Sequence, residues 1–249
     1  MKKVAKHYFA HPSVWTYIVI AILIAFVCIQ QSYFIEYWYC PLLTIVIAPF
    51  FEWFAHKYIL HAQIGNVIEI PLEDGMKVGD KMGKEIFGHT HEVEVLKIKG
   101  DVAEIGYGWA KRMKAFRHFM HILHYGHHED PNLVPLIFAP ILSVLILFAS
   151  LFGVALLVSF SLGAATSFLF GVVIYYLHYE WMHLGHHIPG YKHVFPWSNR
   201  LKTAHQLHHY RNENYWWGIT NSIGDKVMGT YKTHKDVDPS KTIKNINYK

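Results

Sequence analysis

Histidines at short intervals are the most chemically informative feature of this 249-residue sequence, which contains 20 of them. They gather in four stretches, HKYILH, HILHYGHH, HLGHH and HQLHH, and the pattern HxxHH occurs three times. Positions i, i+3 and i+4 share one face of an α-helix, so each HxxHH pattern is expected to direct three imidazoles at a common centre. Neutral imidazole is a good ligand for zinc and iron. The sequence therefore predicts a metal site built from histidine.

Ten histidines from the four stretches are the predicted ligands. They are His56, His61, His124, His127, His128, His183, His187, His205, His208 and His209. One ion takes about four to six ligands, so ten imidazoles indicate a pair of ions. His56 and His61 are separated by roughly 140° on a regular helix. They either share a face through an irregular turn or reach different metals. His187 is chosen over His186, although both positions face His183.

Other polar residues near these stretches could support the ligands. Glu52 precedes His56 by four positions and Glu180 precedes His183 by three, so each carboxylate could accept the second N–H of a ligand. The alternative is a carboxylate at a helix end in water. Three further histidines are candidates for supporting groups or spare ligands: His121, His178 and His186. Four tryptophans are expected to form a belt at the membrane surface: Trp53, Trp181, Trp216 and Trp217.

The sequence excludes sites built from cysteine and the zinc site of HExxH proteases. The only cysteines, Cys28 and Cys40, form no CxxC pair, which rules out a disulfide framework and a cysteine-based zinc site. The HExxH pattern of zinc proteases is also missing. Any metal is therefore expected to be held by imidazole.

Uncharged apolar runs place these histidines beside a membrane. Hydrophobic residues make up 52% of the chain, charged residues 16%, and the mean hydropathy is +0.15. No charged residue occurs from Pro12 to Ile35 or from Leu133 to Leu177, and the second run is long enough for two spans that fold back at Ser159 to Gly163. A further span runs from about Tyr37 to Leu60. The fold class predicted is an all-α membrane protein, a four-span helical bundle with cytosolic histidine-rich helices.

The charge distribution predicts the orientation and the kind of partner. With the N-terminus inside, neither outer loop contains Lys or Arg, so both termini and all histidines are expected to be cytosolic. The net charge of +5 is spread around the spans rather than gathered in a stripe, which favours anionic lipid headgroups and argues against nucleic acid. The C-terminal NINYK carries no endoplasmic reticulum retention signal, which favours a bacterial cytoplasmic membrane over the endoplasmic reticulum.

Four regions are predicted along the chain. Residues 1–63 hold the first two spans and the first histidine stretch, and residues 64–108 form a small soluble β insert, with a hairpin across Gly100 and Asp101. Residues 109–231 hold the other histidine stretches and the last two spans. Residues 232–249 are expected to be a solvated polar tail.

The stretches HKYILH, HYGHHEDP, YEWMHLGHH and AHQLHHYRNENYWWGIT, with GDKVMGT after them, resemble the fatty acid hydroxylase superfamily, which includes sterol desaturases, fatty acid 2-hydroxylases and carotenoid hydroxylases. The resemblance implies four spans and a cytosolic histidine-bound pair of iron ions that activates O₂, with zinc possible as isolated. It carries the ten histidines above over as ligands. The long spacer between the first two stretches departs from the family pattern.

The resemblance implies a monooxygenase that hydroxylates a C–H bond of a membrane lipid or fatty-acyl substrate. A fused cytochrome b5 domain is missing, so electrons are expected from a separate donor of ferredoxin or cytochrome b5 type. A desaturase with the same centre is the alternative enzyme. A histidine-rich membrane metal transporter is the alternative from another class. It would need polar ligands along the spans.

Overall fold

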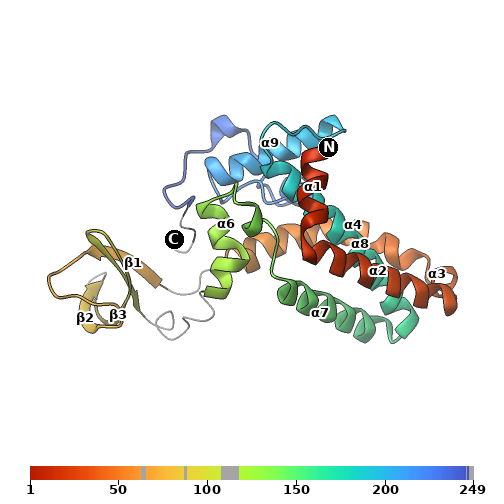
Figure 1. Ribbon diagram of the computed structural model, residues 1–249, viewed down its shortest axis with the longest axis horizontal. Coiled ribbons are helices and arrows are strands. Elements are labelled where there is room, and N and C mark those ends of the chain that lie inside the picture. The colour runs from red at the N-terminus through yellow and green to blue at the C-terminus, as the bar shows by residue number, and fades with distance from the viewer. Residues whose placement is uncertain (63–65, 87–88, 108–117, 245, 247–249) are drawn as a thin grey trace.

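The computed structural model describes residues 1–62, 66–86, 89–107, 118–244 and 246. It consists of a helix bundle and, at the other end of the long axis, a small sheet (Figure 1). The helical elements are α1 (Lys2–Ala10), α2 (Pro12–Gln30), α3 (Tyr33–Glu36), α4 (Tyr39–Phe54), η1 (Ala55–Leu60), η3 (His121–Tyr125), α6 (Gly126–Glu129), η4 (Val134–Leu136), α7 (Ile141–Ser159), α8 (Leu162–His187), α9 (Pro196–Tyr210), α10 (Ile223–Val227) and η5 (His234–Asp236). The strands are β1 (Asn66–Pro71), β2 (Lys81–Ile86), β3 (His89–Lys99) and β4 (Val102–Tyr107).

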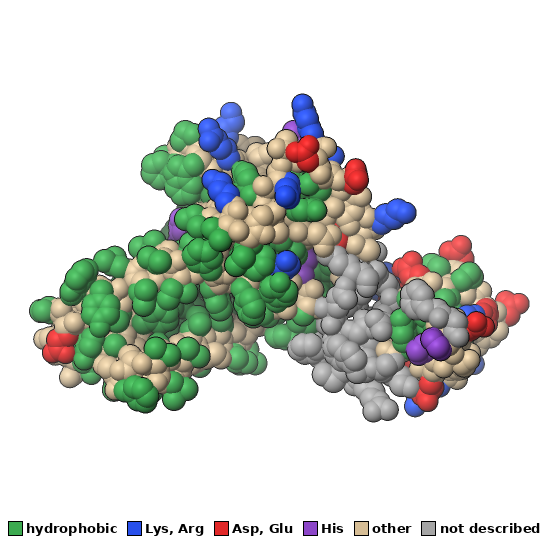
Figure 2. Space-filling model, turned by 180° about the vertical axis from the view of Figure 1, so that it is seen from behind, with side chains coloured by type: hydrophobic (Ala, Val, Ile, Leu, Met, Phe, Trp, Pro, Cys, Tyr) green, Lys and Arg blue, Asp and Glu red, His purple; other side chains and the backbone are tan. Residues whose placement is uncertain are grey.

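Within the described residues, four helical segments are long and apolar enough to cross a membrane, as predicted. They are Pro12–Gln30, Tyr39–Leu60, Val134–Ser159 and Leu162–His187. On the face seen in Figure 2, apolar side chains cover the bundle, whereas Lys and Arg lie on the part of the molecule above it and on the sheet. The chain is therefore an integral membrane protein. The fourth segment continues past Leu177 to His187, so the third histidine stretch is the end of a span.

The predicted turn between the last two spans lies at Phe160 and Ser161. Phe160 adopts a left-handed backbone with φ of 49°, which ends α7. The side chain of Ser161 then accepts a hydrogen bond from the N–H of Ala164 at 3.2 Å and so caps the start of α8. Two residues are therefore enough to reverse the chain and set α7 antiparallel to α8.

Helices α4 and α8 approach each other closely at Gly171. A Cβ atom at this position would lie 2.8 Å from the Cα of Pro41 and 2.9 Å from its carbonyl oxygen. Both obstacles are backbone atoms, so they cannot rotate away. This contact holds together the two spans that end in the first and third histidine stretches.

Gly171→Ala is therefore expected to lower stability by about 1–3 kcal/mol, because the added methyl group forces the two helices apart. Gly153→Ala in α7 is the matched control, since a Cβ atom there meets nothing within 4 Å. Thermal unfolding of the two purified variants in the same detergent checks the difference. Equal midpoints would contradict this account of the packing.

The predicted β insert is a four-stranded antiparallel sheet in the order β1-β4-β3-β2. The hairpin between β3 and β4 turns at Gly100, whose φ of 58° suits glycine. The alternating residues Val93 and Val95 are fully buried against Ala103 and Ile105, which gives the sheet its own core. The predicted boundaries at 63/64 and 108/109 fall within or beside residues outside those described.

Most described residues between 232 and 246 are exposed, but the C-terminal segment also packs on the helices at a few points. Val237 is buried against Ala204 and Trp216. The Nε of Arg211 donates to the carbonyl oxygen of Val237 at 2.8 Å. Further on, the carbonyl oxygen of Ile243 reaches His128.

Candidate metal centre

The ten histidines predicted as ligands lie together in two groups of five. Group one consists of His56, His61, His124, His128 and His208. Group two consists of His127, His183, His187, His205 and His209. Within each group, one ring nitrogen of every residue lies within 4.8 Å of the corresponding nitrogens of the others, and all ten side chains are buried. Each group could therefore hold one metal ion.

An irregular turn explains how His56 and His61 share a group. After Phe54 the helix widens into the π-helical segment η1, and the N–H of His61 donates to the carbonyl oxygen of His56 at 3.1 Å. The additional residue in this turn brings His61 round to the face of His56, with ring centroids 5.1 Å apart. Of the two alternatives given by the sequence, the irregular turn is the one observed.

The HxxHH stretches do not point all three imidazoles at one centre, so that expectation is wrong. His124 and His128 belong to group one and His127 to group two. In α9, His205 and His209 belong to group two and His208 to group one. The reason is angular: i+3 and i+4 lie on opposite sides of position i, about 100° apart, so a pair at i and i+4 faces one group and i+3 faces the other.

The two groups are built alike. Each takes an i, i+4 pair from one HxxHH stretch, a single i+3 histidine from another, and a pair from the end of a span. The span pairs are His56 and His61 for group one and His183 and His187 for group two. Both groups thus depend on the same two crossing elements, η3–α6 and α9.

Backbone carbonyl oxygens orient several of these rings. The Nδ1–H of His56 donates to the carbonyl oxygen of Trp217 at 2.6 Å, that of His208 to Tyr215 at 2.7 Å, and that of His128 to Ile243 at 3.2 Å. A donating Nδ1 leaves Nε2 with a lone pair that can bind a metal. This pattern fixes the tautomer that a ligand requires.

Unbalanced lone pairs show that the donor set fits a cation. The Nε2 atom of His127 lies 3.1 Å from both His183 Nε2 and His187 Nε2. A neutral imidazole carries one ring proton, so His127 cannot donate a full hydrogen bond to both of these nitrogens. In group one, neither ring nitrogen of the buried His61 has a partner among the described residues. Burying such nitrogens without a partner is costly, and a bound ion would remove that cost.

Burial keeps these rings neutral. Desolvation, and then the charge that neighbouring imidazoles would carry, lowers the pKa of His61, His124 and His127 well below the ordinary 6.5. The same two causes lower the pKa of His205 and His209. Only neutral imidazole has the lone pair that binds a metal, so the cluster is ready to bind at neutral pH.

The metal-free protein is therefore expected to lose stability as the pH falls below about 6.5. Below that pH the unfolded chain takes up protons at histidines that stay neutral in the folded state, and the folded state is penalised. Above it both states are neutral and the effect disappears. Thermal midpoints of chelator-treated protein between pH 8 and pH 5 check this. A midpoint that does not change across that range would contradict the neutral cluster.

A short segment, Trp217 to Thr220, ties the histidines to two buried carboxylates. The N–H groups of Trp217 and Gly218 donate to Asp225 at 2.9 and 2.7 Å. Two further backbone N–H groups, of Ile219 and Thr220, donate to Glu52, and the Thr220 hydroxyl donates to it at 2.6 Å. We define these four residues as the 217–220 segment. Its carbonyl oxygens in turn accept hydrogen bonds from His56 and His186.

Glu52 therefore supports the site in a different way from the one predicted. Its carboxylate accepts from the 217–220 segment and from the hydroxyl of Tyr175, whereas the N–H of His56 goes to the Trp217 carbonyl oxygen. Glu180 likewise accepts from Tyr176 at 2.6 Å rather than from His183 among the described contacts. The direct carboxylate–histidine pairs expected from the spacing are thus not formed. Glu52 instead supports His56 indirectly, through the backbone of the 217–220 segment, and Glu180 is bonded to Tyr176.

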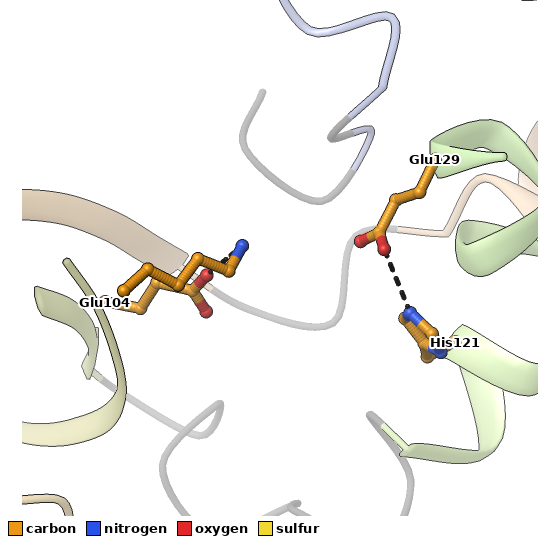
Figure 3. A network of polar contacts seen from close by, with 4 residues as sticks. Glu104, His121 and Glu129 are labelled. Carbon is orange, nitrogen blue, oxygen red and sulfur yellow. Dashed lines mark hydrogen bonds and ion pairs between the residues drawn. The ribbon is translucent and has the colours of Figure 1, made fainter. Parts of the chain in front are cut away.

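The three remaining candidate histidines have different surroundings. His186 is buried, and its ring nitrogens contact the Ile219 carbonyl oxygen at 2.9 Å and His193 at 3.1 Å, so it supports the site without joining either group. His178 is exposed beside Tyr175. His121 is exposed and pairs with Glu129 at 3.2 Å, on the side of the helices toward Glu104 of the insert (Figure 3).

Sequence reasoning missed the roles of Trp216, Trp217 and Asp225. Both tryptophans are buried, so they are not part of a belt at the membrane surface. Trp217 packs against His61, with ring centroids 4.6 Å apart, and its carbonyl oxygen orients His56. The stretch WWGIT is visible in the sequence as part of the family resemblance. The residues that this segment contacts could not be predicted, because most of them are distant in the chain and leave no local pattern.

An apolar cavity of about 250 Å³ leads to both groups. It lies between α4, α7 and α8, and its wall includes Ile47, Phe51, Val144, Leu147 and Phe168. The histidines in the wall come from both groups: His56 and His124 from group one, His127 and His183 from group two. A hydrocarbon chain in this cavity would thus lie against the side chains that could hold the metals.

Comparisons with known proteins agree with this architecture. Residues 109–230 match the family described as fatty acid hydroxylase. The solved structure of full-length Scs7p, in which only the hydroxylase domain is visible, is similar with a TM-score of 0.63 and 17% sequence identity. The match covers 92% of this chain and 68% of that chain, and at this identity it shows a shared fold. None of the curated proteins matches the sequence significantly.

Proposed function

We propose that this chain, whose residues 109–230 match the fatty acid hydroxylase family, is a membrane-bound di-iron monooxygenase. The reaction hydroxylates a C–H bond of a lipid or fatty-acyl substrate with O₂ and external electrons. The observation that carries the proposal is the apolar cavity whose wall contains histidines of both groups. A desaturase with the same centre would place its substrate similarly.

The ten histidines of groups one and two are the proposed metal ligands, five for each ion. Bound iron would supply the oxidising chemistry. The chain itself holds the rings neutral by burial, orients them through backbone carbonyl oxygens, and surrounds the reacting carbon with apolar side chains that exclude water. Zinc would fit the same nitrogens in purified protein.

We place both termini and the metal centre on the cytosolic side and favour a bacterial cytoplasmic membrane. The absence of Lys and Arg from the two outer loops supports this orientation. A separate ferredoxin or cytochrome b5 type protein would supply electrons from the same side. The β insert, an independent sheet beside the helices, is proposed as a docking module or lid.

Mass spectrometry of host lipids with and without the gene tests the proposal. Hydroxylation adds the mass of one oxygen atom to a lipid, whereas desaturation removes the mass of two hydrogen atoms. A variant with both His205 and His209 replaced by Asn controls for effects of expression, because it removes two nitrogens of group two. Identical lipid profiles in all three strains would contradict the enzyme.

A further inference from the structure

Outside the two histidine groups, two polar atoms of the cavity wall have no hydrogen-bond partner among the described residues. Most polar groups in its wall are already paired: the Thr44 hydroxyl donates to the Pro41 carbonyl oxygen at 2.6 Å, and Glu52 is held by the 217–220 segment. Apart from Nδ1 of the group-two histidines His127 and His183, the exceptions are Oε2 of Glu180 and Oγ of Ser143, both buried without a hydrogen-bond partner among the described residues. They come from adjacent helices, α8 and α7.

Glu180 is unusual for its position. It is 1% exposed and lies within the fourth span, where a carboxyl group is costly and generally serves a function. Tyr176 donates to Oε1 at 2.6 Å, and the main chain of Ala139 also supports the carboxyl. A carboxylate can accept about four hydrogen bonds, so these contacts leave capacity on Oε2.

The carboxyl group of Glu180 lies about one helical turn from His183, a histidine of group two. Glu180 precedes His183 by three residues in α8, and both side chains line the cavity. One helical turn separates them, roughly 5 Å along the axis. A group bound at Oε2 would therefore be a few bonds away from a carbon that lies against group two.

We propose that Glu180 and Ser143 form a subsite for the hydroxyl group of the substrate, which would make the preferred substrate a lipid alcohol oxidised within a few carbons of that hydroxyl. This rests on the proposed function and narrows its substrate class. A hydroxyl group suits the pair, because it can donate to a carboxylate and accept from the serine O–H. A free fatty-acid carboxylate is disfavoured there by the cost of burying its charge beside a second carboxyl group.

Binding to the metal-free protein tests the subsite without any turnover. Tritiated 1-dodecanol is bound to the protein in lipid nanodiscs, with empty nanodiscs as the background, and displaced by unlabelled 1-dodecanol, dodecyl methyl ether or dodecanoate. The ether keeps the chain and the oxygen but cannot donate a hydrogen bond. We expect the wild type to prefer the alcohol over the ether by about tenfold, the size of one buried hydrogen bond.

Three variants and a control then locate the preference. Glu180→Leu should abolish it, Ser143→Ala should reduce it, and Glu180→Gln should keep it while binding dodecanoate more tightly than the wild type does. Thr44→Val is the control, because that hydroxyl also lines the cavity but is already bonded to Pro41. It should leave the preference unchanged.

Equal wild-type affinities for alcohol and ether would overturn the subsite. So would a Glu180→Leu variant that loses affinity for all ligands by the same factor, which would show a purely structural role. If that variant does not fold, an unchanged preference in both Ser143→Ala and Glu180→Gln, with no gain for dodecanoate, has the same meaning. Lipid products in the host report on the proposed function independently of these affinities.

Discussion

His124→Gln is expected to lower bound metal from about two ions per chain to about one or fewer, and turnover by roughly a hundredfold or more. His124 is buried in group one, its Nε2 lies 3.2 Å from that of His56, and its side chain lines the cavity. Glutamine keeps the side chain polar but replaces the imidazole nitrogen with a weaker ligand.

His121→Gln is the matched control for this prediction. His121 lies in the same π-helical segment, η3, but its side chain is 47% exposed and pairs with Glu129. Metal content, measured by mass spectrometry of the purified protein, should equal that of the wild type, as should turnover. An equal loss of metal in both variants would mean that η3 had been disrupted as a whole, and it would refute the specific role of His124.

Glu52→Leu is expected to have the second-largest effect, although Glu52 belongs to neither histidine group. The substitution leaves the buried N–H groups of Ile219 and Thr220 without their acceptor, at a cost of about 1–3 kcal/mol for each. The 217–220 segment would then shift and release the carbonyl oxygen that orients His56. Metal affinity should fall by about 10- to 100-fold.

Glu52→Gln separates the two possible causes of that loss. Glutamine keeps an oxygen for the two backbone N–H groups, and its amide N–H₂ can donate to the hydroxyl oxygens of Thr220 and Tyr175. This variant should retain most of the metal affinity, measured by competition with a chromogenic zinc chelator. If Glu52→Gln lost as much affinity as Glu52→Leu, the negative charge rather than the support of the segment would be essential.

The spans and the hairpin could be predicted from the sequence because their signals are local. A charge-free run is sufficient for a span, and alternation around Gly100 and Asp101 is sufficient for a hairpin. The membership of the two groups could not be predicted, because it depends on how η3–α6 and α9 cross. The assumption that HxxHH serves one centre treats a helix in isolation, whereas here η3–α6 and α9 each contribute to both groups.

The supporting contacts were predicted least well. Glu52 stands one turn from His56, which made a direct hydrogen bond reasonable, but backbone N–H groups from residues 219 and 220 occupy its carboxylate. The sequence predicts an irregular turn between His56 and His61 only as one of two alternatives, because the two residues are five positions apart. It contains no signal for the π-helical segment Ala55–Leu60 itself. The burial of Trp216 and Trp217 depends on packing against elements far away in the chain.

The division of two of the three HxxHH stretches, those in η3–α6 and α9, between the groups bears on how the protein acquires its metal. An ion in group one would fix His128 and His208, and thereby hold in place the neighbouring His127 and His209, which face group two. The first ion to bind would then bear the entropic cost of ordering those helices, and the second ion would bind to helices that are already ordered. Loading should therefore be cooperative, with chains that carry a single ion scarce in a titration at half saturation.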